Sequence, residues 1–592
     1  MYIGELLILF TRIVTGGILI FIIFDKTFYN KYCLSIILPV FLTGAANAQP
    51  DLNSVTRNDL EQRRALEREQ AQREVLQKTP DAIQPAAPVA SLPWPEAETP
   101  CFVIHSIVLS GASSADFQWA LQDVLQGNDP ALGRCLGIDG INVAVQRVQQ
   151  KLIGKGFVTS RVLLQPQDLS AGLLTLTLVP GRVRQVRLAD GASQRTTLRN
   201  ALPVQSGDIL NLRAIEQGLE NLKRVPTAEA DIQIVPAELP GESDVVVQWT
   251  QTFPFRITAS VDDSGTRATG KYQGSATVSY DHWLTLNDLF YVTFNHDLGG
   301  GDRGERGTRG QTVHYALPWG YNTFSVTASE SRYYQSVAGF AQDYVYSGTS
   351  QNAEFSVARL IYRDAHRKTS LSVKGWMRRS TNSIDDTEVL AQRRATGGWG
   401  VGIAHKEFLG RATLDLNLSH KRGTAAFGAM PAAEEAFGEG TSRMQVTTVD
   451  ASLDLPFALA GQQWRYQSNW RGQCNGTPLT PQDRFSIGGR YTVRGFDGES
   501  SLMAERGWLL RNDLGLALPA MGAQIYLGVD YGQVSGPSAI WLQGTHLSGA
   551  ALGLRGGLGK ISYEFFVARP ISKPQHFNTA STTAGFSLFA SF

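Results

Sequence analysis

The sequence predicts an α+β N-terminal region of two repeated domains, followed by an all-β transmembrane barrel of about 16 antiparallel strands. Three observations support this fold class. The order β-α-α-β-β occurs twice between residues 101 and 250, which indicates an internal repeat. From residue 253 to residue 592, apolar and polar residues alternate with a period of two, as in strands. Short turns alternate there with long polar loops, the pattern of an outer-membrane barrel.

Residues 1–48 are typical of an extended secretory signal peptide. Residues 6–24 are apolar apart from one arginine, and a second apolar run covers residues 33–42. Ala-Asn-Ala at 46–48 provides a cleavage site, so we expect a mature chain that begins at Gln49. The alternative is that residues 6–24 remain as an inner-membrane helix.

Residues 49–78 are predicted to contain a polar helix. Between 51 and 78, Gly and Pro are absent, and Asn58 or Asp59 can cap the first turn. Arg and Glu alternate around most of its surface, and the apolar stripe is thin: Leu60, Leu66 and Val75. Two interpretations remain open, a helix in solvent or a helix lodged in a polar, water-filled cavity.

A proline-rich linker at 79–100 precedes the two repeats, which occupy residues 101–181 and 182–250. In the first repeat we expect strands at 102–109, 160–165 and 173–179 and helices at 115–126 and 140–155. In the second we expect strands at 183–188, 230–236 and 244–249 and helices near 195–202 and at 212–222.

The cysteines indicate oxidation rather than metal binding. Cys101 and Cys135 lie in the first repeat, and an exported protein can oxidise them. Cys474 is left single, and Cys33 leaves with the signal peptide. No C-x-x-C spacing occurs, and no nucleotide loop or nucleophile elbow is present. We therefore expect no metal, no cofactor and no catalytic residue.

Residues 253–592 are expected to form the barrel. Tight turns at 318–321, 408–411 and 519–522 alternate with loops expected near 299–310, 335–350, 380–392, 421–441 and 474–505. The chain closes on alternating apolar residues that end at Phe592, which we expect to be a C-terminal barrel signal. An even strand number returns both ends to the periplasmic rim. A barrel of this width encloses an aqueous lumen.

The loop 474–505 is too long for a surface turn and holds Val493, Arg494, Gly495 and Phe496. Gly488 and Gly489 precede this tetrapeptide and permit a compact loop that folds into the lumen. In the strand Gln524–Gln533, the apolar residues face lipid, so Asp530 points inward. Arg494 and Asp530 can form a lumenal ion pair, or each can be hydrated separately.

These motifs together resemble the two-partner secretion outer-membrane transporters, the TpsB group (ShlB/FhaC/HecB) of the BamA-like superfamily. Val493-Arg494-Gly495-Phe496 looks like the Val-Arg-Gly-Phe/Tyr loop motif of that superfamily. Gly528-Val-Asp530-Tyr-Gly532 resembles the strand motif whose Asp binds the Arg, and Phe485 to Gly489 matches the approach to the loop. The likeness covers the whole mature chain.

The resemblance implies an outer-membrane transporter that exports a large unfolded TpsA-type partner: an adhesin, a haemolysin or a contact-dependent toxin. It implies POTRA (polypeptide-transport-associated) domains at 101–181 and 182–250, a disulfide between Cys101 and Cys135, and a helix 51–78 that plugs the pore. Outer-membrane lipid and the barrel assembly machinery are further expected partners. No nucleic-acid partner is expected, since the net charge is only +1.

Three other functions remain open from the sequence. A barrel insertase uses the same loop motif, but such relatives usually carry more POTRA domains and lack the helix. A diffusion porin has no use for two periplasmic repeats. A surface enzyme carried by a barrel needs a catalytic cluster in the outer loops, and the sequence shows none.

Overall fold

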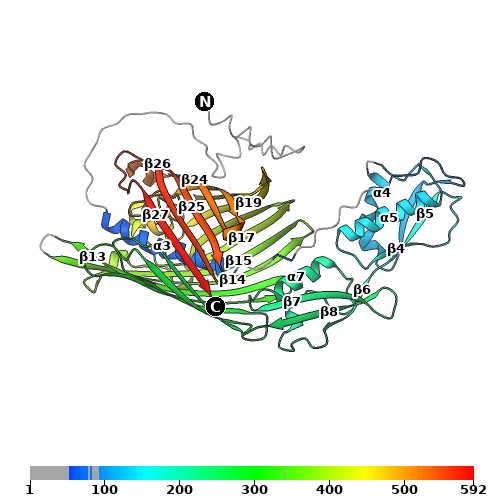
Figure 1. Cartoon of the computed structure of the whole chain (residues 1–592), viewed down its shortest axis with the longest axis horizontal. Coiled ribbons are helices and arrows are strands. Elements are labelled where there is room, and N and C mark those ends of the chain that lie inside the picture. The colour runs from blue at the N-terminus through cyan, green and yellow to red at the C-terminus, as the bar shows by residue number, and fades with distance from the viewer. Residues whose placement is uncertain (1–52, 78–80, 83–92, 128, 340–341) are drawn as a thin grey trace, which may run out of the picture. The chain divides into compact units, whose positions relative to one another are not determined.

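The computed structural model describes residues 53–77, 81–82, 93–127, 129–339 and 342–592 (Figure 1). The predicted signal peptide 1–48, its alternative helix at 6–24 and most of the linker 79–100 lie outside the described residues. Within the described part, no helix has both the length and the apolar character to cross a membrane.

Helix α3 (Asn53–Leu76) is the first described element and lies among the barrel strands in Figure 1. Its 24 residues include neither Gly nor Pro, so nothing in the sequence interrupts it. A solvent-exposed helix is one of the two interpretations of this stretch. That interpretation is wrong, because Glu61 and Gln62 are buried against the barrel.

The first α+β domain has a three-stranded sheet of order β2-β5-β4 with helices against it. The strand expected at 102–109 is divided into β1 and β2, because Ile104 bonds to the Arg134 carbonyl while β2 pairs with β5. The helix expected at 115–126 begins as a 3-10 helix. The elements are β1 (Phe102–Val103), β2 (Ser106–Gly111), η1 (Ser114–Leu121), α4 (Gln122–Gln126), β3 (Cys135–Leu136), α5 (Ile138–Gly154), β4 (Arg161–Leu164) and β5 (Leu173–Val179).

The second α+β domain repeats this arrangement with a sheet of order β6-β8-β7. In both domains the first strand pairs parallel to the central one and the remaining strand antiparallel. Trp249 is fully buried in its core, which extends to Leu289 and Tyr291 of the barrel and Leu76 of α3. The elements are β6 (Arg182–Leu188), α6 (Leu198–Ala201), α7 (Leu212–Leu222), β7 (Ala228–Pro236) and β8 (Glu242–Gln251).

The barrel is closed and antiparallel, and β27 pairs with β9 to complete it. Sixteen strands form the wall, as the sequence predicted, and the two-residue β16 (Thr387–Glu388) only extends the hairpin of β15. The wall strands are β9 (Phe255–Asp262), β10 (Gln273–Asp281), β11 (Leu289–Asp297), β12 (Arg306–Trp319), β13 (Asn322–Ala338), β14 (Asp343–Arg363), β15 (Arg367–Ile384), β17 (Arg394–Leu409), β18 (Ala412–Thr424), β19 (Gln445–Leu459), β20 (Gln462–Asn475), β23 (Arg506–Leu518), β24 (Ala523–Ser535), β25 (His546–Leu558), β26 (Ile561–Ser572) and β27 (Thr583–Ser591).

Two of the loops expected from the sequence are wholly or partly strand. β13 continues to Ala338 and β14 begins at Asp343, so the stretch 335–350 is mostly a hairpin. β15 likewise runs through the start of the stretch 380–392. A tilted strand needs about 9–11 residues to cross the hydrocarbon core, and β14 has 21. The outer part of β14 extends beyond the lipid, so both faces of the strand contact water there, and its sequence is polar.

The segment 476–505 between β20 and β23 folds inward and has its own small sheet. β21 (Phe485–Ile487) pairs with β22 (Leu502–Ala504), and both strands are buried. Apolar side chains of this segment pack together with side chains of the neighbouring wall: Phe485, Ile487, Val493, Phe496, Leu502, Ala504, Leu509, Val534, Leu547 and Phe577. The inner loop is therefore a packed element attached to one side of the barrel.

Candidate functional site

Arg494 of the inner loop binds Asp530 of β24 inside the barrel. Nε and Nη2 of Arg494 donate to the two carboxylate oxygens of Asp530, each at 2.7 Å. The backbone N–H of Arg494 donates to Oδ2 as well, at 2.9 Å. Both side chains are almost fully buried, at 2% and 1% exposure. A bidentate, charge-assisted pair of this kind fixes position and orientation together.

A second carboxylate completes the site. Nη2 of Arg494 also donates to Oδ1 of Asp513 on β23, at 2.6 Å, and Arg555 on β25 binds the other oxygen of Asp513 at 3.3 Å. Arg511 lies 3.8 Å from Asp530. The buried charges are thus compensated within one network, as burial in a low-dielectric region requires.

The glycines of the strand motif leave room for this loop. A Cβ atom on Gly528 would lie 2.5 Å from Nη2 of Arg494, and one on Gly532 would lie 2.8 Å from Cγ2 of Val493. Gly549 on β25 has the same role, because a Cβ atom added there would lie 1.9 Å from the carbonyl oxygen of Arg494. Sequence reasoning missed Gly549, which stands in no recognisable motif.

The other motif residues shape the loop. Gly488 and Gly495 have positive φ angles of 113° and 99°, which favour glycine. The amide of Gly489 donates to Oγ1 of Thr492. Phe496 packs edge-to-face on Phe577 with ring centroids 5.7 Å apart.

Arg490 ties the loop to the barrel seam and was also missed from the sequence. Its Nη1 binds Oδ1 of Asp263, just after β9, and donates to the carbonyl oxygen of Phe586 on β27 at 2.8 Å. Oδ1 of Asp263 also accepts a hydrogen bond from the backbone amide of Phe586 at 2.9 Å. Phe592 continues the seam by exchanging two backbone hydrogen bonds with Ile257. The inner loop thus contacts the wall at the seam and at β23–β25.

The N-terminal half of α3 contacts the outer part of the lumen and the inner loop. Glu61 accepts from Thr266 at 3.2 Å and Thr269 at 3.0 Å. Gln62 accepts a bond from Gln482 at 2.7 Å, and Arg64 donates to the carbonyl oxygen of Gly498. The helix thus touches the inner loop at two points.

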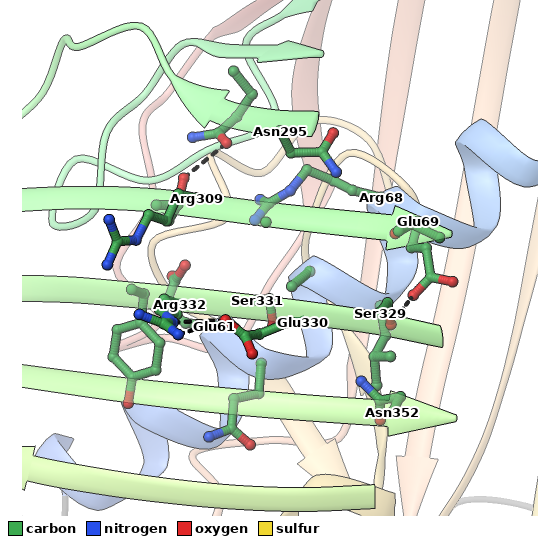
Figure 2. Close-up of a pocket in the computed structure, with 18 residues that line it drawn as sticks. Glu61, Arg68, Glu69, Asn295, Arg309, Ser329, Glu330, Ser331, Arg332 and Asn352 are labelled. Carbon is green, nitrogen blue, oxygen red and sulfur yellow. Dashed lines mark hydrogen bonds and ion pairs between the residues drawn. The ribbon is translucent and has the colours of Figure 1, made fainter. Parts of the chain in front are cut away.

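The C-terminal half of α3 contacts strands β11–β13. Glu69 accepts from Ser329 at 3.0 Å, Gln72 donates to Asn295 at 3.0 Å, and Gln77 donates to the Tyr291 hydroxyl at 3.2 Å. A cavity lined mainly by polar residues remains beside the helix, and Figure 2 shows Glu69 bonded to Ser329 among these residues. Except for Leu76 at the end, these contacts are polar, as expected for a helix in a wet lumen.

Two other predicted features lie away from the lumen. Cys101 and Cys135 form a disulfide in the first α+β domain, with Cα atoms 5.2 Å apart. Cys474 lies on β20 opposite Thr447. Among the described residues, no group of His, Cys, Asp and Glu side chains is arranged to hold a metal ion.

Comparison with known proteins gives matches along most of the chain. The family model described as haemolysin secretion/activation protein ShlB/FhaC/HecB matches residues 241–556. A POTRA domain model of the ShlB type matches residues 102–181, and a further POTRA domain model matches residues 182–236.

Individual relatives agree with the family models. The chain is 36% identical over 587 residues to the outer membrane transporter CdiB-2 of Burkholderia pseudomallei (strain 1026b), covering 94% of this chain and 99% of the relative. The solved structure of CdiB from Acinetobacter baumannii is similar with a TM-score of 0.80 and 32% identity, covering 92% of this chain and 100% of that chain. CdiB from Escherichia coli is similar with a TM-score of 0.76 and 26% identity, covering 92% of this chain and 100% of that chain.

Proposed function

Since the chain belongs to the ShlB/FhaC/HecB family of haemolysin secretion/activation proteins, we propose that its barrel lumen is the export path and that α3 plugs this path at rest, while the inner loop stays packed against the wall. The protein is an outer-membrane transporter of two-partner secretion. It takes a large unfolded partner protein from the periplasm to the cell surface through the barrel.

The proposal rests on one observation: the contacts that hold α3 in the lumen are mainly polar. Glu61, Gln62 and Glu69 accept hydrogen bonds that hold α3, and Gln72 donates one; among the described side chains of α3, Leu76 at its end is the member of a buried apolar cluster. Water can replace such hydrogen bonds, because a neutral one contributes only about 0.5–1.5 kcal/mol and one to a carboxylate such as Glu61 or Glu69 about 1.5–3 kcal/mol. A plug held in this way can leave a water-filled pore, whereas a plug with an apolar core would remain.

The two α+β domains, proposed as POTRA domains at 101–181 and 182–250, supply the recognition step. β2 and β4 are the edge strands of the first sheet, and β6 and β7 those of the second. An unfolded chain can add a strand to such an edge through backbone hydrogen bonds, which tolerates varied side chains. The partner therefore needs no single short signature sequence to be captured.

The partner is proposed to be a TpsA-type protein of the kind that CdiB transporters export, since the relatives compared carry that name. The chain acts as a transporter and not as an enzyme, and folding of the partner outside the cell supplies the driving force. Outer-membrane lipid and the barrel assembly machinery act during biogenesis.

Comparison of the secretome with and without this gene tests the proposal. Deletion should remove one large protein from the cell surface and medium, and the intact gene should restore it. The proposal fails if the surface proteins are unchanged while the partner is made.

A further inference from the structure

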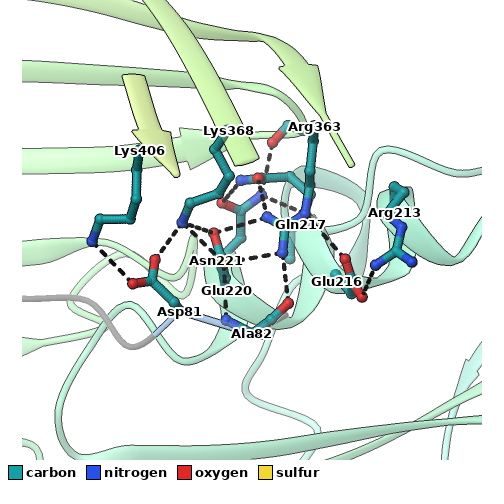
Figure 3. Close-up of polar contacts among 12 residues, drawn as sticks. Asp81, Ala82, Arg213, Glu216, Gln217, Glu220, Asn221, Arg363, Lys368 and Lys406 are labelled. Atoms are coloured by element: carbon teal, nitrogen blue, oxygen red, sulfur yellow. Dashed lines mark hydrogen bonds and ion pairs between the residues drawn. The ribbon is translucent and has the colours of Figure 1, made fainter. Parts of the chain in front are cut away.

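Asp81 and Ala82 of the linker after α3 are held at the periplasmic rim of the barrel, between the wall and the second α+β domain (Figure 3). The carboxylate of Asp81 binds Lys368 on β15 and Lys406 on β17, the latter at 3.0 Å. The amide of Ala82 donates to Oε1 of Glu220 on α7 at 2.9 Å. The carbonyl oxygen of Ala82 accepts from Nη2 of Arg363 on β14 at 2.6 Å. Three barrel strands and one domain helix thus hold two linker residues.

This contact is built around a buried charge network. Arg363 is 3% exposed and binds Glu216 at 3.2 Å and Glu220 at 3.1 Å, both on α7. Lys368 also reaches Glu220, at 3.2 Å. Removal of one partner from a buried pair costs about 3–5 kcal/mol, because an uncompensated charge stays buried, whereas exposed pairs contribute about 0–1 kcal/mol. The linker is therefore joined to the same residues that join α7 to the barrel wall.

The chain length between the helix and this contact limits movement of the helix. Five peptide steps separate Leu76 from Asp81, a reach of at most about 18 Å. α3 has 24 residues and is about 36 Å long. While Asp81 and Ala82 stay at the rim, Leu76 cannot move more than about 18 Å beyond it. When α3 moves toward the periplasm along the pore axis as an intact helix, about half of it then remains in the lumen, and the pore cannot clear.

We propose that Asp81 and Ala82 form a latch that must detach from Arg363, Lys368, Lys406 and Glu220 before α3 leaves the lumen. The proposal rests on the function of α3 as a plug. Glu220 lies on α7 of the second α+β domain, so a shift of that domain on binding an unfolded client removes part of the latch. Client capture in the periplasm and opening of the pore are coupled through this one contact.

Asp81 offers a clean test, because its loss leaves no lysine without an acidic partner. Lys368 keeps Glu220, and Lys406 keeps Asp415 at 3.3 Å. The second domain also stays attached through bonds that do not involve the linker, such as Asn221 to the Gly320 carbonyl oxygen at 2.7 Å. A change at Asp81 therefore acts on the latch and not on the fold.

The experiment measures single-channel conductance of the full mature chain in planar bilayers. Asp81→Lys should raise the fraction of time in the large open state about tenfold, the change that 1.4 kcal/mol produces in an equilibrium. The conservative variant Asp81→Glu keeps a carboxylate for Lys368 and Lys406 and should leave that fraction near wild type. The matched control, Glu96→Gln, removes a charge from an exposed position of the same linker and should change nothing.

A chain that lacks residues 53–76 is measured in parallel and separates the two proposals. If this deletion opens the pore and Asp81→Lys leaves gating at the wild-type level, the latch is refuted and the plug stands. If the deletion leaves conductance unchanged, the plug and the latch are both refuted. Equal opening by Asp81→Lys and Asp81→Glu also contradicts the latch, because the effect would then not depend on the carboxylate that binds the two lysines.

Discussion

Arg494 satisfies both carboxylate oxygens of Asp530 with its side chain and one of them again with its own backbone amide. The Asp530 carboxylate therefore fixes the backbone of the loop as well as the guanidinium group of Arg494. Because Asp513 accepts from the same Nη2 atom, the loop is joined to two adjacent strands, β23 and β24. This relationship makes the inner loop a fixed part of the lumen wall rather than a free segment.

Replacement of Arg494 should stop secretion without preventing barrel assembly. Arg494→Ala leaves two buried carboxylates with fewer partners, at a cost of about 3–5 kcal/mol. We expect a heat-modifiable barrel in the outer membrane and loss of the partner from the medium. Arg494→Lys keeps the charge but cannot make the three-point contact, so secretion should fall between wild type and alanine.

The control for that change is Arg506→Ala, which removes an exposed arginine bound to Asn475 at the end of the same segment. It should secrete at the wild-type level. Normal secretion by Arg494→Ala would show that the buried pair is not needed for export.

Removal of α3 should enlarge the pore. Deletion of residues 53–76 takes a charged helix out of a polar lumen, so ion conductance in planar bilayers should rise several-fold. Glu61→Gln keeps an acceptor for Thr266 and Thr269 but weakens two charge-assisted bonds, so it should open the pore only briefly. Equal conductance of the deletion and the wild type would be inconsistent with a plug.

Cleavage of the disulfide should destabilise the first α+β domain. The bond between Cys101 and Cys135 closes a loop with a sequence separation of 34, for which chain entropy predicts about 4 kcal/mol. In the unreduced mature protein, a maleimide should label Cys474 alone, and after reduction it should label all three cysteines. Labelling of Cys101 before reduction would exclude the bond.

The second α+β domain should lose stability at low pH through Asp244. Hydrogen bonds from Arg184, at 2.7 and 2.6 Å, and from Gln185 lower the pKa of its carboxyl. A folded pKa below the unfolded one means that the contribution is complete above about pH 4 and is lost as pH falls toward the folded value. The part of the tryptophan fluorescence that Trp249→Phe removes reports on this domain and should follow the change in full-length protein.

Asp244→Asn is the comparison for that titration. It should be less stable at pH 7 and should show a weaker dependence on acid. If wild type and variant lose the Trp249 signal in parallel between pH 5 and pH 2, Asp244 is not the group responsible.

The sequence was sufficient for features that repeat or alternate. Period-two alternation predicted the barrel and the inward direction of Asp530, and the two repeats predicted both α+β domains. The sequence was insufficient for polar stretches, because these occur both in loops and in strands that extend beyond the membrane. The hairpin of β13 and β14 was taken for a loop, since strands beyond the membrane have no apolar face.

Contacts distant in sequence were also beyond prediction. The contacts of Arg490 at the seam and of Asp513 with Arg494 join segments that only the fold brings together. The latch at Asp81 joins residues from the linker, α7 and three strands, and no local pattern marks any of them.

Export through the lumen is tested most directly by fixing the plug in place. In a Cys474→Ser background, Glu69→Cys and Ser329→Cys place thiols on α3 and β13, where the native side chains meet at 3.0 Å. A short bis-maleimide should join them and stop secretion, while each single-cysteine chain treated in the same way should still secrete. Undiminished secretion by the cross-linked chain would contradict export through this lumen.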